Sequence, residues 1–147
     1  MATVKKLLDG ARAHNMIVVF NLTGGGKVED MVDQSLASLG GEFMVKGSGG
    51  ADKFVNSDLD AGLKEKGIKT VIVTGTSAQG AVGGTTNGAA QRGYKAVVPV
   101  DCMSVEDTFN ELYAVWHIPA NLTGNATVTR SDLIRFGGEP NQSADLV

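Results

Sequence analysis

Apolar positions along the chain follow two patterns, one typical of helices and one typical of buried strands. Apolar residues three and four positions apart, as at Val4, Leu7 and Ala11, predict one face of a helix. Short runs rich in β-branched residues, such as residues 16–20, predict buried strands. The predicted helices cover residues 4–14, 28–39, 57–67 and 104–118, and the predicted strands cover residues 16–20, 42–46, 70–74, 95–100 and 126–129.

Local signals predict where two of these helices begin and where one ends. Ser57 and Ser104 are expected N-caps, because a serine side chain can accept a hydrogen bond from the free N–H groups at a helix start. Pro119 is expected to end the helix that begins at Ser104. The apolar side chains of that helix are expected to face inward, and they are Phe109, Leu112, Tyr113 and Trp116.

Residues 75–93 form a segment of unusually small side chains, which is predicted to run from a loop into a helix. Four residues of this segment carry at most a methyl group and project almost nothing from the helix: Gly83, Gly84, Ala89 and Ala90. The composition therefore predicts a helix that packs very close to a neighbouring backbone.

Strands that alternate with helices through short Gly-rich turns are typical of parallel βαβ units. We therefore predict an α/β fold with a mostly parallel sheet covered on both faces, in one domain over residues 1–136 with a polar tail at 137–147. In such sheets, ligands bind beyond the carboxyl ends of the strands. Lys46, residues 74–81, and Asp101 with Cys102 are expected at that edge.

Composition excludes several classes of partner. With 42% hydrophobic residues and a net charge of −3, the chain is expected to fold and offers no basic surface to a nucleic acid. The longest apolar run, residues 16–20, is too short to cross a membrane, and there is no signal pattern, so a cytoplasmic location is predicted. Cys102 is the single cysteine, which offers neither a disulfide nor metal-binding spacing, and its context favours a small buried hydrophobe over a nucleophile.

The stretch 74–85 carries the most informative local chemistry. Gly75 and Gly80 have the spacing of a phosphate-binding loop, but Ala81 and Val82 stand where that loop needs a lysine and a serine or threonine. Phosphate-loop chemistry is therefore excluded. The remaining feature is a helix N-terminus whose free N–H groups can hold a carbonyl oxygen or a carboxylate. The candidate substrate-binding residues are Thr76, Gln79, Gly80 and Ala81, and glycines that serve only close packing are the alternative.

A series of residues through most of the chain resembles one protein family. The run 70–75 is followed by Val82, Thr85, Ala89, Gly93, Tyr94 and residues 97–101, and upstream of it lie Val45, Lys46, Phe54, Ser57 and Leu59. In order and spacing, these residues resemble the isochorismatase-like cysteine hydrolases from about residue 11 to residue 136. The resemblance implies a three-layer α/β/α sandwich in which Lys46 matches the family's lysine and Ala81 stands at the position of its nucleophilic cysteine.

This chain departs from the family pattern at three places. An alanine methyl group cannot attack a carbonyl, so covalent cysteine catalysis at Ala81 is excluded. The family's aspartate belongs to a first strand, but this chain opens in what looks like the following helix, and Asp9 there is not a credible substitute. Residues 21–27 stand where one branch of the family has a metal-binding loop, and they do not support a catalytic metal, so neither a metal nor a cofactor is predicted.

These departures leave three interpretations open. The isochorismatases that the resemblance includes also lack the cysteine, so the leading hypothesis is a hydrolase of a small carbonyl- or carboxylate-bearing molecule that works without covalent cysteine catalysis. Lys46 is the expected catalytic residue and would hold the substrate, with a plain exposed lysine as the alternative. The second interpretation is an inactive binding or oligomer-scaffolding member, and the third is a truncated product of a longer hydrolase.

Four further residues are candidates for the wall of a pocket: Phe54, Asp101, Trp116 and His117. For Trp116 and His117, which share the end of one predicted helix, core packing is the alternative. A homo-oligomer is also expected, because an absent first strand would leave a sheet edge that seeks a partner. The predicted partners are thus a small-molecule substrate and a second copy of the chain, with no nucleic acid and no membrane.

Overall fold

The computed structural model describes residues 1–22, 33–46, 50–104, 106–121 and 124–137. Its helices are α1 (Ala2–Ala13), α3 (Leu59–Glu65), α4 (Gly83–Gln91) and α5 (Thr108–Asn121), with a π-helical segment η3 (Ala78–Val82) and 3-10 turns η2 (Gln34–Leu36), η4 (Val100–Cys102) and η5 (Ser131–Leu133). Its strands are β1 (Val19–Phe20), β2 (Phe43–Met44), β3 (Thr70–Ile72), β4 (Gly75–Thr76), β5 (Lys95–Pro99), β6 (Met103–Ser104) and β7 (Ala126–Thr129). No helix in these ranges is long and apolar enough to cross a membrane.

All the strand pairs in the described ranges are parallel, as the alternation of strands and helices predicts. The strands form one sheet in the order β3-β5-β7 and two separate pairs, β1-β2 and β4-β6. In the register of the larger sheet, Val71 lies opposite Ala96, and Val98 lies opposite Val128. Among the described strands, β1 pairs only with β2 and β3 only with β5, so each keeps one edge without ladder hydrogen bonds.

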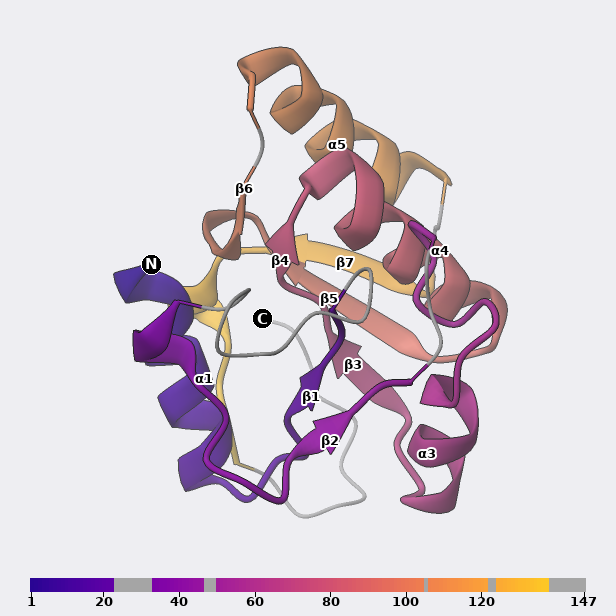
Figure 1. Cartoon of the computed structure of the whole chain (residues 1–147). Helices are drawn as coiled ribbons and strands as arrows, with labels where there is room; N and C mark the ends of the chain where they lie inside the picture. Colours follow the sequence, from indigo (N-terminus) through magenta and orange to yellow (C-terminus); the bar gives the residue numbers. More distant parts are fainter. Residues whose placement is uncertain (23–32, 47–49, 105, 122–123, 138–147) are drawn as a thin grey trace.

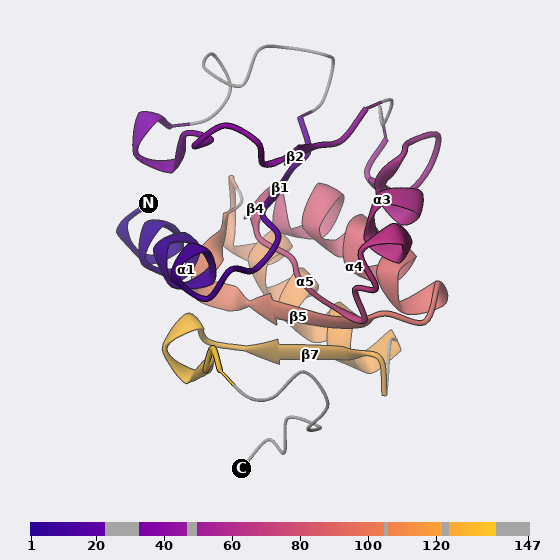
Figure 2. The ribbon, with the colours of Figure 1, turned by 90° about the horizontal axis from the view of Figure 1, so that it is seen from below.

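The elements form three layers, as predicted for this α/β fold. Figures 1 and 2 show the strands lying between α1 on one side and α3 and α4 on the other. Helix α4 packs against β5, and α5 packs against β7 and η3. Val19 of β1 and Val71 of β3 both pack against the same apolar cluster, so the β1-β2 pair and the larger sheet share one core.

The core consists of two clusters of buried apolar side chains. The first joins α3, α4 and β5 and contains Phe54, Leu59, Leu63, Ala89, Tyr94 and Ala96. The second joins η3, β5 and α5 and contains Ala78, Val82, Val98, Ala114 and Ile118. The second cluster lies under the segment that follows β4, and it therefore fixes the position of the candidate site.

Helix α4 lies very close to a neighbouring backbone, as its small residues predict. A Cβ atom on Gly84 would lie 2.8 Å from the carbonyl carbon of Ala51, and one on Gly88 would overlap the carboxylate of Asp52. Both distances are too short for any residue with a side chain unless neighbouring atoms move. The segment 50–54 therefore runs directly across α4 because glycine occupies both positions.

Several predictions about helix ends are wrong. Residues 33–39 contain only the short turn η2 where the helix 28–39 is predicted, and residues 28–32 lie outside the described ranges, as do residues 138–147 of the predicted tail. Ser104 lies in β6, and Asp107 caps α5 instead, since its Oδ1 accepts a hydrogen bond of 2.9 Å from the N–H of Asn110. Ser57 is not the N-cap of α3 either, because Asp58 occupies that position, without a capping bond from its side chain. Ser57 lies one residue earlier, and its hydroxyl oxygen accepts a long 3.4 Å bond from the N–H of Leu59. Pro119 lies inside the last turn of α5 and does not end it.

The side chains of α5 that are predicted to face inward lie on the surface. Phe109, Leu112, Tyr113 and Trp116 are 75%, 64%, 40% and 65% exposed. The opposite face of the helix, with Ala114 and Ile118, packs on the second cluster. The prediction is wrong because α5 is apolar on two faces, and the core takes the face whose smaller Ala114 allows a closer approach.

Candidate functional site

The candidate site begins where β4 leads into the segment η3 and then into α4. Gly75 has a φ of +124°, a conformation that glycine adopts without strain, and the peptide bond between Thr76 and Ser77 is cis. Ser77 is extended and precedes the first residue of η3. A Cβ on Gly80 would lie 2.5 Å from the hydroxyl oxygen of Ser77, so this hydroxyl lies directly beside the first turn. The first N–H groups of such a helical segment have no partners within it and favour an acceptor.

A cavity of about 170 Å³ lies beside this first turn, between α4 and α5. It is lined by Ala78, Gln79, Gly83, Gly84, Asn87, Tyr113, Ala114, His117 and Ile118. Two predicted site residues that are far apart in the sequence, Gln79 and His117, are therefore brought together. The rings of Tyr113 and His117 are stacked with their centroids 4.9 Å apart, which holds both rings at the edge of the cavity.

The polar atoms that line this cavity come from neutral side chains and one histidine. Gln79 and Asn87 contribute amide groups, Tyr113 a phenol and His117 an imidazole. The Asn87 amide oxygen already accepts a hydrogen bond of 2.9 Å from the Nε2 of Gln91. Each of these groups can donate a hydrogen bond, and no carboxylate occurs among the lining residues. The lining therefore suits a small polar ligand and includes no carboxylate that would repel an anion.

Lys46 lies two residues beyond β2, and its side chain is exposed. Its backbone is held at two points by Asp58. The N–H of Lys46 donates a 2.8 Å hydrogen bond to Oδ1 of Asp58, and its carbonyl accepts a 3.2 Å bond from the N–H of Asp58. Lys46 does not line the α4–α5 cavity. The structure thus places a fixed backbone and an exposed ammonium group at the end of β2.

Three other predicted binding residues flank the cavity without lining it. Thr76 is exposed in β4, and its hydroxyl donates a long 3.4 Å hydrogen bond to the carbonyl of Ser104. Gly80 and Ala81 are half-buried in η3. Of the predicted set in this segment, Gln79 alone contributes to the cavity wall.

Asp101 and Cys102 are engaged in contacts of their own. Asp101 accepts hydrogen bonds from the N–H of Ser131 at 2.8 Å and from its hydroxyl at 2.7 Å, so it ties η4 to η5. Burial raises the pKa of the Asp101 carboxyl, but the bonds from Ser131 outweigh this effect and leave the pKa below its usual range. Cys102 is only 2% exposed, and burial, followed by the charge of Asp101, raises the pKa of its thiol. Such a thiol is poorly reactive.

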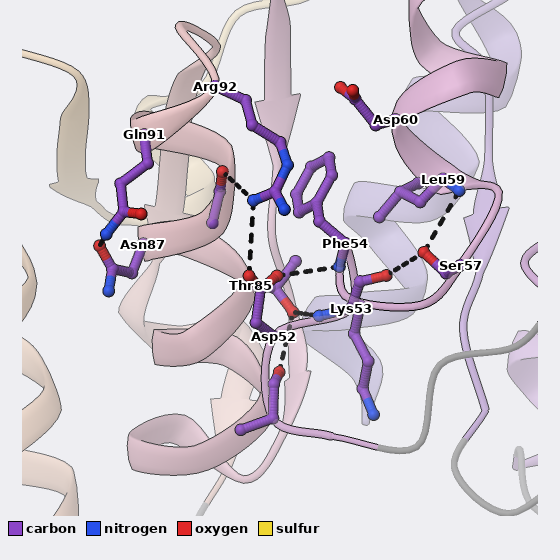
Figure 3. A network of polar contacts seen from close by, with 12 residues as sticks. Asp52, Lys53, Phe54, Ser57, Leu59, Asp60, Thr85, Asn87, Gln91 and Arg92 are labelled. Carbon is purple, nitrogen blue, oxygen red and sulfur yellow. Dashed lines mark hydrogen bonds and ion pairs between the residues drawn. The ribbon is translucent and has the colours of Figure 1, made fainter.

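Phe54 lies in the first core cluster, not in a cavity wall. Its ring stacks on Tyr94 at a centroid distance of 5.7 Å, and the guanidinium of Arg92 lies 4.9 Å from the ring centroid. Figure 3 shows how Asp52 completes this arrangement, since it accepts a 2.8 Å bond from the N–H of Phe54 and lies 3.5 Å from Arg92 Nη1. Trp116 is 65% exposed and lies outside the cavity lining.

Lys53 is a buried charged residue that the sequence does not single out. It is 6% exposed, and its ammonium donates a 2.7 Å hydrogen bond to the carbonyl of Gly50. Its backbone N–H donates to the hydroxyl of Thr85 on α4 at 3.2 Å, as Figure 3 shows. A lysine between an aspartate and a phenylalanine carries no sequence signal of burial. Its burial follows from the passage of segment 50–54 across the glycines of α4.

No group of three or more histidine, cysteine, aspartate or glutamate side chains in the described ranges could hold a metal ion.

The chain matches one protein family in sequence and several solved structures in fold. The model of the isochorismatase domain family matches residues 1–131 of the chain. No curated protein matches the chain in sequence. The chain is similar in structure to an isochorismatase family protein from Desulfovibrio vulgaris, with a TM-score of 0.76, 19% identity and coverage of 90% of this chain and 82% of that one. It is also similar to N-carbamoylsarcosine amidase from Thermoplasma acidophilum (TM-score 0.70, 21% identity, 90% and 83% coverage). A nicotinamidase from Bacillus subtilis is another such structure (TM-score 0.70, 14% identity, 88% and 83% coverage).

Proposed function

Because this chain belongs to the isochorismatase family, we propose that it is a hydrolase acting on a small molecule with a carbonyl or carboxylate group. In this proposal, Ala81 occupies the position of the family's nucleophilic cysteine, and hydrolysis proceeds without a covalent thioester. The native thiol of Cys102 does not replace that nucleophile, because it is buried and its pKa is raised by burial. Water is then the attacking group, and the protein binds and orients the substrate.

The proposed class of ligand rests on the hydrogen-bonding side chains around the α4–α5 cavity. Gln79, Asn87, Tyr113 and His117 can each donate a hydrogen bond, and the lining contains no carboxylate that would repel an anion. A volume of about 170 Å³ accommodates only a small ligand or one part of a larger one. Acceptor oxygens of a carbonyl or carboxylate satisfy this donor set.

Two further features support binding of a negative group. The free N–H groups at the start of η3 carry a partial positive charge, and those of Gly80 and Ala81 are the proposed oxyanion donors. One such donor contributes about 2.7–4 kcal/mol to transition-state stabilisation in acyl-transfer enzymes. Lys46 does not line the α4–α5 cavity, so it is proposed to hold a part of the substrate that extends beyond the cavity, while Asp58 keeps its backbone in place.

Turnover measured by mass spectrometry tests this function directly. The substrates are isochorismate, nicotinamide and N-carbamoylsarcosine, chosen from the names of the family and of the similar structures. We expect hydrolysis of at least one of them by the wild type, and its loss in Lys46→Ala. Lys66→Ala is the matched control, because Lys66 is an exposed lysine at the end of α3 and should be dispensable. Equal activity in both variants would remove Lys46 from the mechanism.

The Ala81→Cys variant tests whether position 81 corresponds to the family's nucleophilic cysteine. If the segment 76–82 retains the geometry of the family, the new thiol should give thiol-dependent amidase activity that iodoacetamide abolishes. The buried Cys102 provides the internal control, because wild-type protein treated with iodoacetamide should be unaffected. An inert Ala81→Cys protein that is correctly folded would instead point to the missing aspartate of the family, which the new thiol would need.

Binding without turnover is a second candidate function. It is favoured by the alanine at position 81 together with a cavity lined by hydrogen-bond donors and no carboxylate. Calorimetric titration with the same three compounds distinguishes the two functions. Micromolar binding that Gln79→Ala weakens, without any product formed, would favour the binding protein over the hydrolase.

A further inference from the structure

A second cavity, the basic cavity, lies at the opposite end of the sheet from the candidate site. It has a volume of about 110 Å³, and its lining includes Lys64, Gly67, Lys69, Arg92, Gly93 and Tyr94. These residues come from the turn between α3 and β3 and from the turn between α4 and β5. The basic cavity is therefore at the amino ends of two parallel strands, whereas η3 lies beyond the carboxyl end of β3.

The side chains around the basic cavity carry an excess of positive charge. Three residues of the lining, Lys64, Lys69 and Arg92, are cations, and no carboxylate belongs to the lining. Two exposed lysines adjoin it, Lys66 at the end of α3 and Lys95 at the start of β5. The N–H of Lys95 donates a 2.9 Å hydrogen bond to the carbonyl of Lys69, which fixes the two turns side by side. In a chain of net charge −3, five cations thus gather at one end of the sheet.

Two carboxylates contact these cations from outside the lining. Asp60 lies 2.7 Å from Lys64 Nζ and accepts a 2.8 Å hydrogen bond from the hydroxyl of Tyr94. Asp52 lies 3.5 Å from Arg92 Nη1, which is long for a hydrogen bond. Burial, followed by the hydrogen bond to Asp60, raises the pKa of Tyr94 to about 12, so its phenol stays neutral. The two carboxylates therefore balance at most two of the three cations in the lining.

Arg92 and Lys69 keep hydrogen-bond donors for a ligand. Arg92 is held in place, because its Nη1 donates a 2.9 Å bond to the carbonyl of Gly88 and its guanidinium lies over the ring of Phe54, as Figure 3 shows. The N–H groups on its Nε and Nη2 form no hydrogen bond with a described residue. The exposed ammonium of Lys69 likewise has no ion pair within the described ranges. A fixed guanidinium fork beside a free ammonium is a donor set that binds phosphate oxygens.

The size of the basic cavity also suits a phosphate group. Its volume is several times the roughly 30 Å³ that one water takes up, and it is well below the roughly 300–1,000 Å³ of cavities for drug-sized ligands. A phosphate group carries a charge of about −1.5 to −2 and at least three acceptor oxygens, which can reach cations on several sides. We propose that the basic cavity binds a phosphate group, either as inorganic phosphate or as part of a small phosphate monoester.

Titration of the ¹⁵N-labelled protein, followed by NMR, tests the proposal. The two ligands are inorganic phosphate and glycerol 3-phosphate, and sodium chloride at the same ionic strength controls for screening of surface charges. We expect both phosphates to shift the backbone amide signals of Gly67 and Gly93 until saturation, and sodium chloride to leave them in place. Tighter binding of glycerol 3-phosphate would identify a monoester as the ligand, and tighter binding of inorganic phosphate would identify the free ion.

Matched lysine variants test whether the cations of the cavity hold the ligand. Lys69→Gln removes a charge that has no ion pair, so it should raise the dissociation constant roughly tenfold while circular dichroism shows a folded protein. Lys69→Arg keeps the charge and should keep most of the affinity. Lys6→Gln is the matched control, because Lys6 is an exposed lysine of α1, far from both turns in the sequence, and its loss should change nothing.

Three results would overturn the proposal. The first is the absence of saturable shifts at Gly67 and Gly93, or equal shifts with sodium chloride. The second is an equal affinity of Lys69→Gln and Lys6→Gln for phosphate. The third is a set of shifts confined to Gln79 and Gly80, which would place the phosphate at η3 instead. The basic cavity and the α4–α5 cavity share no lining residue, so each of these results leaves the proposed hydrolase activity to its own test.

Discussion

Replacing Gly84 with alanine tests whether the contact between α4 and the segment 50–54 is as close as described. The added Cβ would lie 2.8 Å from the carbonyl carbon of Ala51 and 3.0 Å from its carbonyl oxygen. These are backbone atoms, which cannot rotate away as the end of a side chain can, so one of the two segments must shift. Over-packing of this kind costs about 1–3 kcal/mol, whereas the better helix propensity of alanine returns about 1 kcal/mol.

We expect Gly84→Ala to lose up to about 2 kcal/mol of unfolding free energy, a fall of up to roughly 6 °C in Tm for a chain of this length. Gly10→Ala in α1 is the matched control, because its Cβ would lie 2.6 Å from the end of the Phe136 ring, which can turn aside. The control should be neutral or more stable by up to about 1 kcal/mol. Thermal and urea unfolding followed by circular dichroism measure both variants. A Gly84→Ala protein as stable as Gly10→Ala would refute the reasoning.

Four further predictions concern charged and reactive side chains. Arg12 donates hydrogen bonds of 2.8 and 3.0 Å to the carboxylate of Glu42, so Arg12→Lys, which cannot keep both, should lose about 1–2 kcal/mol in urea unfolding. The hydrogen bond from Arg12 lowers the pKa of Glu42 in the folded protein. The stabilisation from this pair is therefore complete above the ordinary pKa of 4.5 and is lost as the pH falls through the lower folded pKa. Thermal unfolding at acidic pH should show this loss of stability, and the loss should be smaller in Glu42→Gln. Burial raises the pKa of the Asp101 carboxyl, but the hydrogen bonds from Ser131 lower it by more than burial raises it. Ser131→Ala should therefore raise this pKa, which a carboxyl NMR titration measures. Cys102 should react with Ellman's reagent only after denaturant is added, and fast reaction of the native protein would contradict its burial.

Helix α1 and strand β7 could be predicted almost to the residue, because each has one clear pattern with polar residues or glycine at its ends. The predicted helix 4–14 is observed as Ala2–Ala13, and the predicted strand 126–129 as Ala126–Thr129. Strand β1 is shorter than its apolar run, since Met16 and Ile17 are 39% and 38% exposed. An apolar run shows that a segment avoids water, but it does not show how many of its residues find a strand to pair with.

The candidate site could be predicted in part. The small side chains of residues 75–93 indicate the close approach seen at Gly84, because sterics alone determine that distance. Gln79 and His117 are predicted separately and line the same cavity. The burial of Lys53 could not be predicted, since it depends on how the segment 50–54 crosses α4 and not on any local pattern.

Helix α5 shows that hydrophobic periodicity can identify an apolar helix face without showing what covers that face. The spacing of Phe109, Leu112 and Trp116 indicates side chains that leave water, yet the core of this chain takes the opposite face of the helix. A single domain covers one face of a surface helix, so a second apolar face either stays in water or is covered by another molecule. The prediction is wrong because hydrophobic periodicity shows that a helix face is apolar, but it does not show which of two apolar faces the core covers.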